Sequence, residues 1–318
     1  MPLPSVTLPE AATWAWIPIV LWAAFAQTIR NAAQRTLTTQ VGTLPATLVR
    51  FLYGLPFACT WVFVVWHIQG ASDPSALRPS FSWPWAAWLA FGAVAQLGAT
   101  ALLLMAMKER NFIVAVSLSK TEVLQVALFG TLFLHELPGW VGGLAMLVAT
   151  LGVVMLSAPN SQGKSDVPDQ SWWSAAAAMG LGSGALFAFS AVGYRGAALT
   201  QIGVSPWLVG AWGVMWAQLL QSLLLGGYLA ASSPQGLVAI AKAWRLSLMA
   251  GTMGAMASIG WFTAFALRPA ADVRTLGLVE VLFSYLVSRK LFKEGLSAGE
   301  RIGLTLVTVG LLGVCSQL

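Results

Sequence analysis

Charged residues are scarce in this chain: Asp, Glu, Lys and Arg make up only 9% of its 318 residues, against 58% hydrophobic residues. Soluble proteins are roughly a quarter charged, so this chain lacks the polar residues to build a water-facing surface. A soluble cytoplasmic enzyme is therefore excluded. Intrinsic disorder is excluded as well, because disordered chains are polar and poor in aromatic residues. The class that remains is a polytopic α-helical membrane protein.

Residues that commonly carry catalytic, redox or metal chemistry are also few. The two cysteines, Cys59 and Cys315, lie within apolar runs and form no disulfide framework. The sequence shows no cluster with metal-ligand spacing, no nucleophile elbow and no nucleotide-binding loop. We therefore expect no catalytic residues, no metal site and no cofactor. The net charge of +6 is interpreted as a topology signal, because the basic residues stand mostly at expected helix ends.

Long apolar runs, cut at polar residues, Pro and Gly, predict ten transmembrane helices. Their expected ranges are 14–34, 45–66, 84–107, 112–133, 138–158, 172–193, 206–231, 245–267, 272–291 and 298–317. The longest connections are 67–83, 159–171 and 232–244, so no extramembrane domain is expected. The predicted fold class is an all-α integral membrane protein of ten transmembrane helices. The predicted location is the inner cell membrane, which the chain crosses many times.

An internal repeat divides the predicted helices into two halves. Residues 122–136 (EVLQVALFGTLFLHE) align with residues 280–294 (EVLFSYLVSRKLFKE) at an offset of 158. Upstream, Gln40-Val41-Gly42 aligns with Gln201-Ile202-Gly203 at an offset of 161. Because five helices in each half is an odd number, the halves must enter the membrane in opposite directions. Such inverted repeats are typical of alternating-access transporters.

The arrangement resembles the drug/metabolite transporter superfamily, in its EamA-like branch. The motifs are Arg50-Phe51 at the start of the second span, Phe133–Glu136 at the end of the fourth, and Leu291–Glu294 in the second half. The sequence departs from the family pattern at Ala23, where Gly is usual, and after Pro206, where no Arg-Phe pair follows. The resemblance covers nearly the whole chain. It implies secondary transport of a small solute, without naming the solute.

The resemblance also sets the predicted domains. Residues 1–158 form a first EamA-like five-helix repeat and residues 172–318 a second, joined by a central loop at 159–171.

Ionisable side chains inside a bilayer are costly, so each is a candidate for function. Glu122 and Glu280 are repeat mates near the centres of the expected fourth and ninth spans. They either take part in transport or tie helices together by hydrogen bonds. Lys120 stands two residues before Glu122, about 200° around a helix, so the two side chains should not face each other. Lys120 either belongs to an internal ion pair or meets the substrate.

A polar stripe runs along the first span, where Gln27, Arg30 and Gln34 share one helical face. The matching face of the sixth span carries Ser190 and Tyr194. Both faces are expected to line one cavity, although Arg30 could instead extend toward the membrane surface.

Two further residues leave alternatives open. Arg50 either contacts substrate or anchors a helix end at the interface. Trp261 either walls a cavity, faces lipid or packs against other helices. The predicted substrate-binding residues are Gln27, Arg30, Asn31, Gln34, Arg50, Lys120, Glu122, Ser190, Tyr194, Trp261 and Glu280.

The predicted function is a secondary transporter that moves a small polar or amphoteric metabolite, such as an amino acid, by alternating access. Cations and carboxylates in one site suit a zwitterion, whereas an anion fits if the glutamates serve only as internal partners. Proton coupling requires a glutamate that gains and loses a proton, which nearby cations oppose. The alternatives are an organic cation or drug antiporter driven by protons and, in another class, a membrane enzyme or a protein that handles lipid head groups.

The expected partners are a small-molecule solute, membrane lipid and, where coupling holds, protons, with no nucleic acid. The chain is expected to act as a monomer or homodimer.

Two signals for the orientation of the chain in the membrane disagree. Four basic residues, Arg78, Arg195, Arg268 and Arg274, are assigned to the side of the termini, and ten to the opposite side. The positive-inside rule then places both termini outside, whereas the family resemblance implies that both lie inside.

Overall fold

The computed structural model describes residues 14–72, 77–109, 119–157, 175–283, 286 and 298–316. Every regular element among these residues is a helix, which confirms the all-α prediction for this part of the chain. The helices are α2 (Trp16–Val41), α3 (Thr43–Leu52), α4 (Leu55–Ser72), α5 (Trp83–Glu109), α7 (Glu122–Leu134), α8 (Trp140–Ser157), α9 (Ala175–Leu199), α10 (Pro206–Ser232), α11 (Pro234–Lys242), α12 (Trp244–Leu267), α13 (Ala270–Leu276) and α15 (Ala298–Cys315).

Within the described residues, four helical stretches are long and apolar enough to cross a membrane: Thr43–Ser72, Trp83–Met107, Pro206–Ser232 and Trp244–Leu267. Shorter apolar helices cover Glu122–Leu134, Trp140–Leu156 and Arg301–Cys315. Large hydrophobic side chains are exposed on the outside of the bundle, for example Phe63, Leu151 and Leu312, while Glu, Arg and Lys side chains are buried inside it. Apolar outside and polar inside is the distribution of an α-helical membrane protein. The number of spans stays a prediction.

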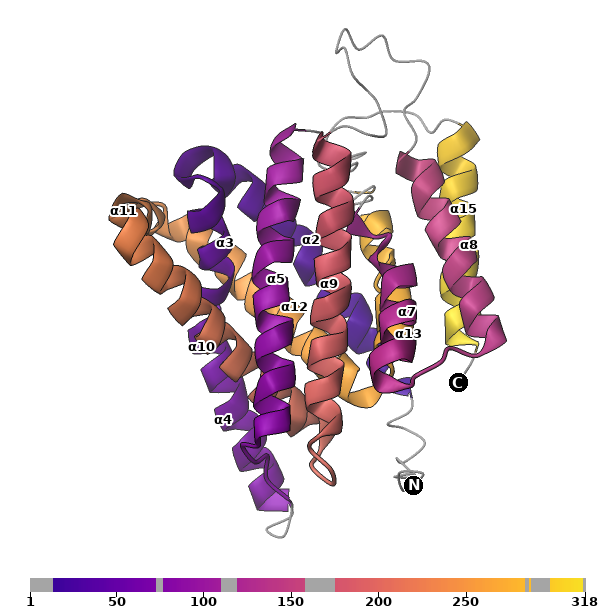
Figure 1. The fold of residues 1–318 in the computed structure, drawn as a ribbon, viewed down its shortest axis with the longest axis horizontal. Helices are drawn as coiled ribbons and strands as arrows, with labels where there is room; N and C mark the ends of the chain where they lie inside the picture. Colours follow the sequence, from indigo (N-terminus) through magenta and orange to yellow (C-terminus); the bar gives the residue numbers. More distant parts are fainter. Residues whose placement is uncertain are drawn as a thin grey trace, which may run out of the picture.

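The helices pack in pairs drawn from distant parts of the sequence. α5 lies along α9 at the centre of the bundle, and α8 lies along α15 at one side (Figure 1). α2 packs along α12, and α10 packs against both α3 and α4. Each half of the sequence therefore contributes a helix to every one of these contacts, and the interior between them is shared.

Two glycines shape equivalent corners of the chain. Gly42 separates α2 from α3 with φ 88°, and Gly203 lies between α9 and α10 with φ 77°. A residue with a Cβ is strained in this left-handed region, whereas Gly is not. These are the two glycines that the sequence aligns at an offset of 161.

Several predicted spans are interrupted. The expected helix 112–133 had Glu122 near its centre, but α7 begins at Glu122, after a turn at residues 120–121. The expected helix 272–291 is also broken: α13 ends at Leu276, residues 277–278 form a turn, and residues 279–283 are helical again. The predictions of unbroken helices at these two places are therefore wrong, and both glutamates stand just after a turn.

Smaller corrections concern connections and ends. The expected span 45–66 is divided into α3 and α4 by a turn at residues 53–54. The expected loop 232–244 contains α11, which begins with Pro234 at a position where Pro favours a helix start. α2 continues to Val41, beyond the expected end at 34. The predicted central loop 159–171 lies outside the described residues.

α8 and α15 approach each other through glycine. A Cβ on Gly152 would lie 2.6 Å from the carbonyl oxygen of Gly303, and one on Gly310 would lie 2.6 Å from the Cβ of Ala149. Such contacts are closer than side chains tolerate, so glycine is required for the backbones to come this near. Small residues at helix contacts are typical of membrane helices.

Candidate functional site

Glu280 is the centre of a buried polar cluster. Its Oε1 accepts a hydrogen bond from Nδ2 of Asn31 at 2.7 Å, and its Oε2 accepts one from Nε2 of Gln27 at 2.7 Å. The same Oε2 lies 2.5 Å from Nζ of Lys120. The carboxylate thus joins α2, the turn before α7 and the segment after α13. The structure brings these four predicted site residues together.

Glu122 forms the second carboxylate of the cluster. Its Oε1 lies 3.3 Å from Nη1 of Arg274 and 3.9 Å from Nζ of Lys120. Lys120 therefore lies between two carboxylates. The expectation that Lys120 and Glu122 face away from each other is wrong, because it assumed a continuous helix and Lys120 is in the turn before α7. As the first residue of α7, Glu122 also interacts favourably with the helix dipole.

Arg30 lies beside this cluster and has neutral acceptors. Its Nε and Nη2 donate to Oδ1 of Asn31 at 3.2 and 2.6 Å, and its Nη1 donates to Oε1 of Gln27 at 3.5 Å. The side chain does not extend to the membrane surface, since Arg30 is only 1% exposed. Gln34, on the same stripe, instead donates from Nε2 to the carbonyl oxygen of Ala46 at 2.8 Å, which ties α2 to α3.

A second polar group lies around Arg50 and Tyr194. Arg50 is 1% exposed, so the interfacial-anchor alternative is wrong, and its Nη1 donates to Oγ1 of Thr100 at 3.0 Å. The Tyr194 hydroxyl donates to Oε1 of Gln96 at 2.9 Å, and Nε2 of Gln221 donates to the same oxygen at 2.9 Å. Ser190, one turn before Tyr194, is also buried. These side chains come from α3, α5, α9 and α10.

Trp261 links the cluster to aromatic rings. Its Nε1 donates to Oε1 of Gln27 at 2.9 Å. The guanidinium of Arg274 lies 4.9 Å from the Trp261 ring and 5.4 Å from the Phe265 ring, distances that allow cation–π attraction. Trp261 therefore has a polar role within the cluster that the sequence did not predict.

Sequence reasoning missed several members of the site. Arg274 was counted among the loop cations that set orientation, but it is buried and paired with Glu122, so it does not belong in that count. Gln96 and Gln221 were not singled out. The available signal was the one used for the glutamates: a polar residue well inside an apolar span. Whether these residues touch a solute stays a prediction.

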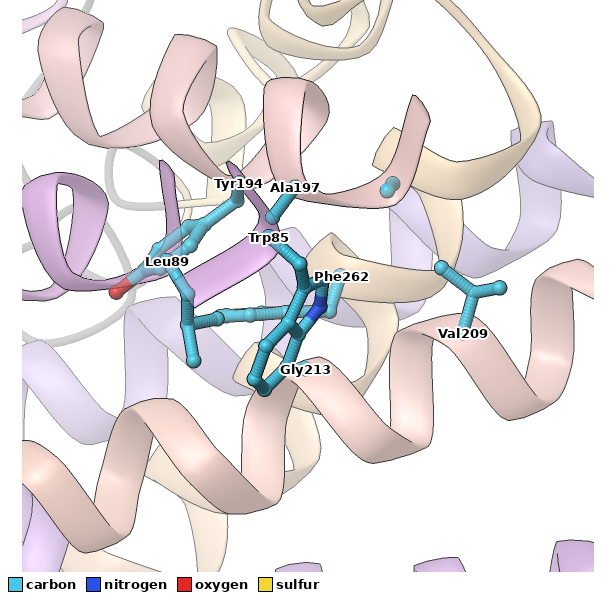
Figure 2. A pocket seen from close by; sticks show the side chains of 8 residues that line it. Trp85, Leu89, Tyr194, Ala197, Val209, Gly213 and Phe262 are labelled. Carbon is cyan, nitrogen blue, oxygen red and sulfur yellow. The ribbon is translucent and has the colours of Figure 1, made fainter. Parts of the chain in front are cut away.

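A small pocket adjoins the second polar group. Figure 2 shows the rings of Trp85, Tyr194 and Phe262 around it, with Leu89 and Val209 at its wall. Its volume is about 10 Å³, close to the smallest space that holds one water molecule. The pocket is therefore too small for a metabolite in this conformation.

A separate ion pair holds three elements together away from the cluster. Arg195 on α9 donates from Nε to Oε1 of Glu136 at 2.8 Å and from Nη1 to the carbonyl oxygen of Phe265 on α12 at 2.7 Å. The predicted span 172–193 ends before Arg195, whereas α9 continues to Leu199.

We predict that Arg195→Gln lowers the free energy of unfolding by about 1.5–3 kcal/mol, because hydrogen bonds that involve a charged group contribute in this range. Thermal unfolding of the purified protein in detergent measures the change. Arg245→Gln is the control, since Arg245 is an exposed cation on α12 and exposed substitutions usually have small effects. Equal stability of the two variants would show that the Arg195 contacts contribute nothing.

Comparison with known proteins identifies the fold only. No family model and no curated protein matches the chain. The chain is similar to 22 solved chains. One, described as "Crystal structure of protein", has a TM-score of 0.63 at 17% identity over 96% of this chain and 96% of that one. This similarity extends over nearly the full length of both chains, so a fold of this shape exists in an experimentally determined structure.

Proposed function

We propose that this chain is a secondary transporter of the drug/metabolite type that moves a small polar solute across the inner membrane by alternating access. The observation that carries the proposal is the ion-pair cluster of Glu280, Lys120, Glu122 and Arg274 inside a bundle of apolar helices. Buried ionisable groups are costly in a membrane, and they typically mark a pathway for solutes or ions.

The broken helices support this proposal. Non-helical backbone at membrane depth is tolerated where it is enclosed by protein or lines a cavity. Transporters built from inverted repeats place their binding sites at such interruptions, because the exposed helix ends provide polar groups. Here the turn at 120–121 directly precedes Glu122, and the turn at 277–278 ends two residues before Glu280. The two carboxylates share Lys120.

The helix contacts support a two-fold relation between the halves. If the two predicted halves are exchanged, α5 takes the place of α12 and α9 takes the place of α2. The α5–α9 pair therefore corresponds to the α12–α2 pair, and both pairs are in close contact. The same exchange maps α8–α15 onto itself, and it maps the packing of α10 against α3 and α4 onto itself as well. Two halves related in this way can exchange conformations, which would expose one central site first to one side and then to the other.

The ion pairs of the two glutamates bear on whether transport is coupled to protons. A proton-coupled carrier needs a carboxyl group that releases and regains its proton in each cycle. Glu280 already has Lys120 as partner, and Glu122 has Arg274, so both glutamates have a structural use as charged groups. We therefore propose exchange or facilitated transport without an obligatory proton.

Transport in sealed liposomes tests the proposal. Metabolites that raise the unfolding temperature of the purified protein are loaded at high concentration, and uptake of the labelled solute from outside is measured. We expect exchange that needs the protein, returns the solute chemically unchanged, and does not respond to an imposed pH gradient. A covalently altered solute would indicate a membrane enzyme. Flux that requires a pH gradient would indicate a proton antiporter.

A further inference from the structure

The buried charges of the described residues do not balance. Six charged side chains are buried there, four cations and two carboxylates, which leaves a formal excess of two positive charges: Arg30, Arg50, Lys120, Arg274, Glu122 and Glu280. Uncompensated charge is expensive to bury, and more so in a bundle surrounded by lipid. The two excess positive charges therefore need a physical explanation.

The excess is located on Arg30 and Arg50. Both carboxylates have their ion pairs with the other two cations: Glu280 with Lys120 at 2.5 Å, and Glu122 with Arg274 at 3.3 Å. Within the described residues, neither Arg30 nor Arg50 forms an ion pair with a carboxylate; their side-chain acceptors are an Asn, a Gln and a Thr. The glutamates thus serve as internal partners for other residues.

The two arginines are neighbours. Both flank Gly254 of α12, where an added Cβ would lie 3.2 Å from Cγ of Arg50 and 3.3 Å from Cδ of Arg30. Nε of Arg50 is buried and has no hydrogen-bond partner among the residues that the structure describes. A guanidinium has five N–H donors, and Arg50 uses one of them on Thr100. Two buried cations therefore lie side by side, and Nε of Arg50 is available to donate a hydrogen bond to an anionic oxygen.

We propose that Arg30 and Arg50 together bind an oxyanion group, a carboxylate, sulfonate or phosphate, of the solute, which makes this protein a carrier of small anions. The proposal rests on the transport function proposed above. The planar guanidinium fork matches the geometry of carboxylate and phosphate oxygens. An anion between the two arginines also removes their mutual repulsion.

The surroundings favour an anion over a zwitterion or a cation. Next to Arg50 the polar groups are neutral: the Tyr194 hydroxyl, Gln96 and Gln221 hydrogen-bond to one another. An ammonium group would need a carboxylate of its own, and both buried carboxylates of the described residues are already paired. The rest of the solute is therefore expected to be uncharged.

Binding is measured first, without transport. Purified full-length protein is unfolded thermally in an uncharged detergent with sodium acetate, sodium sulfate or sodium phosphate, at constant ionic strength. Glycine and tetramethylammonium chloride serve as zwitterion and cation probes. We expect at least one of the three oxyanions to give a saturable rise in the unfolding temperature, and glycine and tetramethylammonium to give none.

The variants locate the effect. Arg30→Gln and Arg50→Gln should each weaken anion binding about tenfold to a hundredfold, the range expected for a lost hydrogen bond to a charged group. Arg30→Lys and Arg50→Lys retain the positive charge and serve as the test if a Gln variant does not fold. They should bind the anion with intermediate affinity. Arg35→Gln, an exposed change on the same helix, is the control for net charge and for the general stabilising effect of sulfate and phosphate.

The outcomes separate the two proposals. Anion binding that depends on Arg30 and Arg50 without any flux in liposomes would support the anion site and contradict the transporter. Flux of a cation or zwitterion that survives both Gln substitutions would support the transporter and overturn the anion site. Equal stabilisation of the wild type, the Gln variants and Arg35→Gln by all three anions would overturn the anion site directly.

Discussion

Replacing Glu280 by Gln is expected to abolish transport and to lower the free energy of unfolding by about 3–5 kcal/mol, the range for removing one partner of a buried ion pair. The Glu280 carboxylate accepts hydrogen bonds from Gln27 and Asn31 and lies 2.5 Å from Nζ of Lys120. Gln keeps the size of the side chain but removes the charge. Lys120 then lacks its closest anion, inside a cluster that already has excess positive charge.

Glu122→Gln is the matched comparison and should cost less. Lys120 lies 3.9 Å from Glu122 but retains Glu280, and Arg274 still lies against aromatic rings. Flux in liposomes and thermal unfolding measure both variants. The double variant Glu280→Gln with Lys120→Met should recover stability but not transport, because it removes both charges of the pair. Equal effects of the two Gln substitutions would contradict the assigned pairing.

Gly152→Val is expected to separate α8 from α15 and to lower the free energy of unfolding by about 3 kcal/mol or more, because overpacking a tight contact forces the backbone to move. A Cβ at this position would lie 2.6 Å from the carbonyl oxygen of Gly303 and 2.7 Å from the backbone nitrogen of Val307. Backbone atoms in two packed helices cannot turn aside as a flexible side chain does.

Gly143→Val is the control on the same helix, since an added Cβ there meets no described residue within 4 Å. Valine has the same intrinsic helix propensity at both positions, so the difference between the variants isolates the helix contact. Thermal unfolding in detergent measures that difference. Unfolding temperatures that agree for the two variants would show that α8 and α15 do not depend on this close approach.

Hydrophobic runs predict the helices of this chain well, because a membrane helix must be apolar over a fixed length. The bounds of α5, α8, α10 and α12 differ from the predicted ranges by at most two residues. Breaks within a run were missed at residues 53–54, 120–121 and 277–278. Hydropathy is insensitive to them, since a turn enclosed by other helices requires no polar sequence of its own.

The sequence predicted several residues of the candidate site but not the contacts between them. Buried ionisable residues stand out in an apolar sequence, so Glu122, Glu280 and Lys120 were found. Their pairing was not, because it depends on the turn before α7 and on Arg274, which stands close enough to the start of its span to be mistaken for an interfacial residue. Three-dimensional proximity between positions such as Asn31 and Glu280, 249 residues apart, is not encoded in local spacing.

Alternating access requires that one buried site becomes accessible from each side of the membrane in turn. Ser190 is a suitable reporter because it is fully buried, lies one turn from Tyr194, and resembles Cys in size. Ser190→Cys, in a background with Cys59→Ser and Cys315→Ser, is treated with a membrane-impermeant thiol reagent in right-side-out and in inside-out vesicles. Under alternating access, we expect labelling from both sides, with transported solute changing the two labelling rates in opposite directions. Labelling from one side only, whatever solute is present, would contradict it.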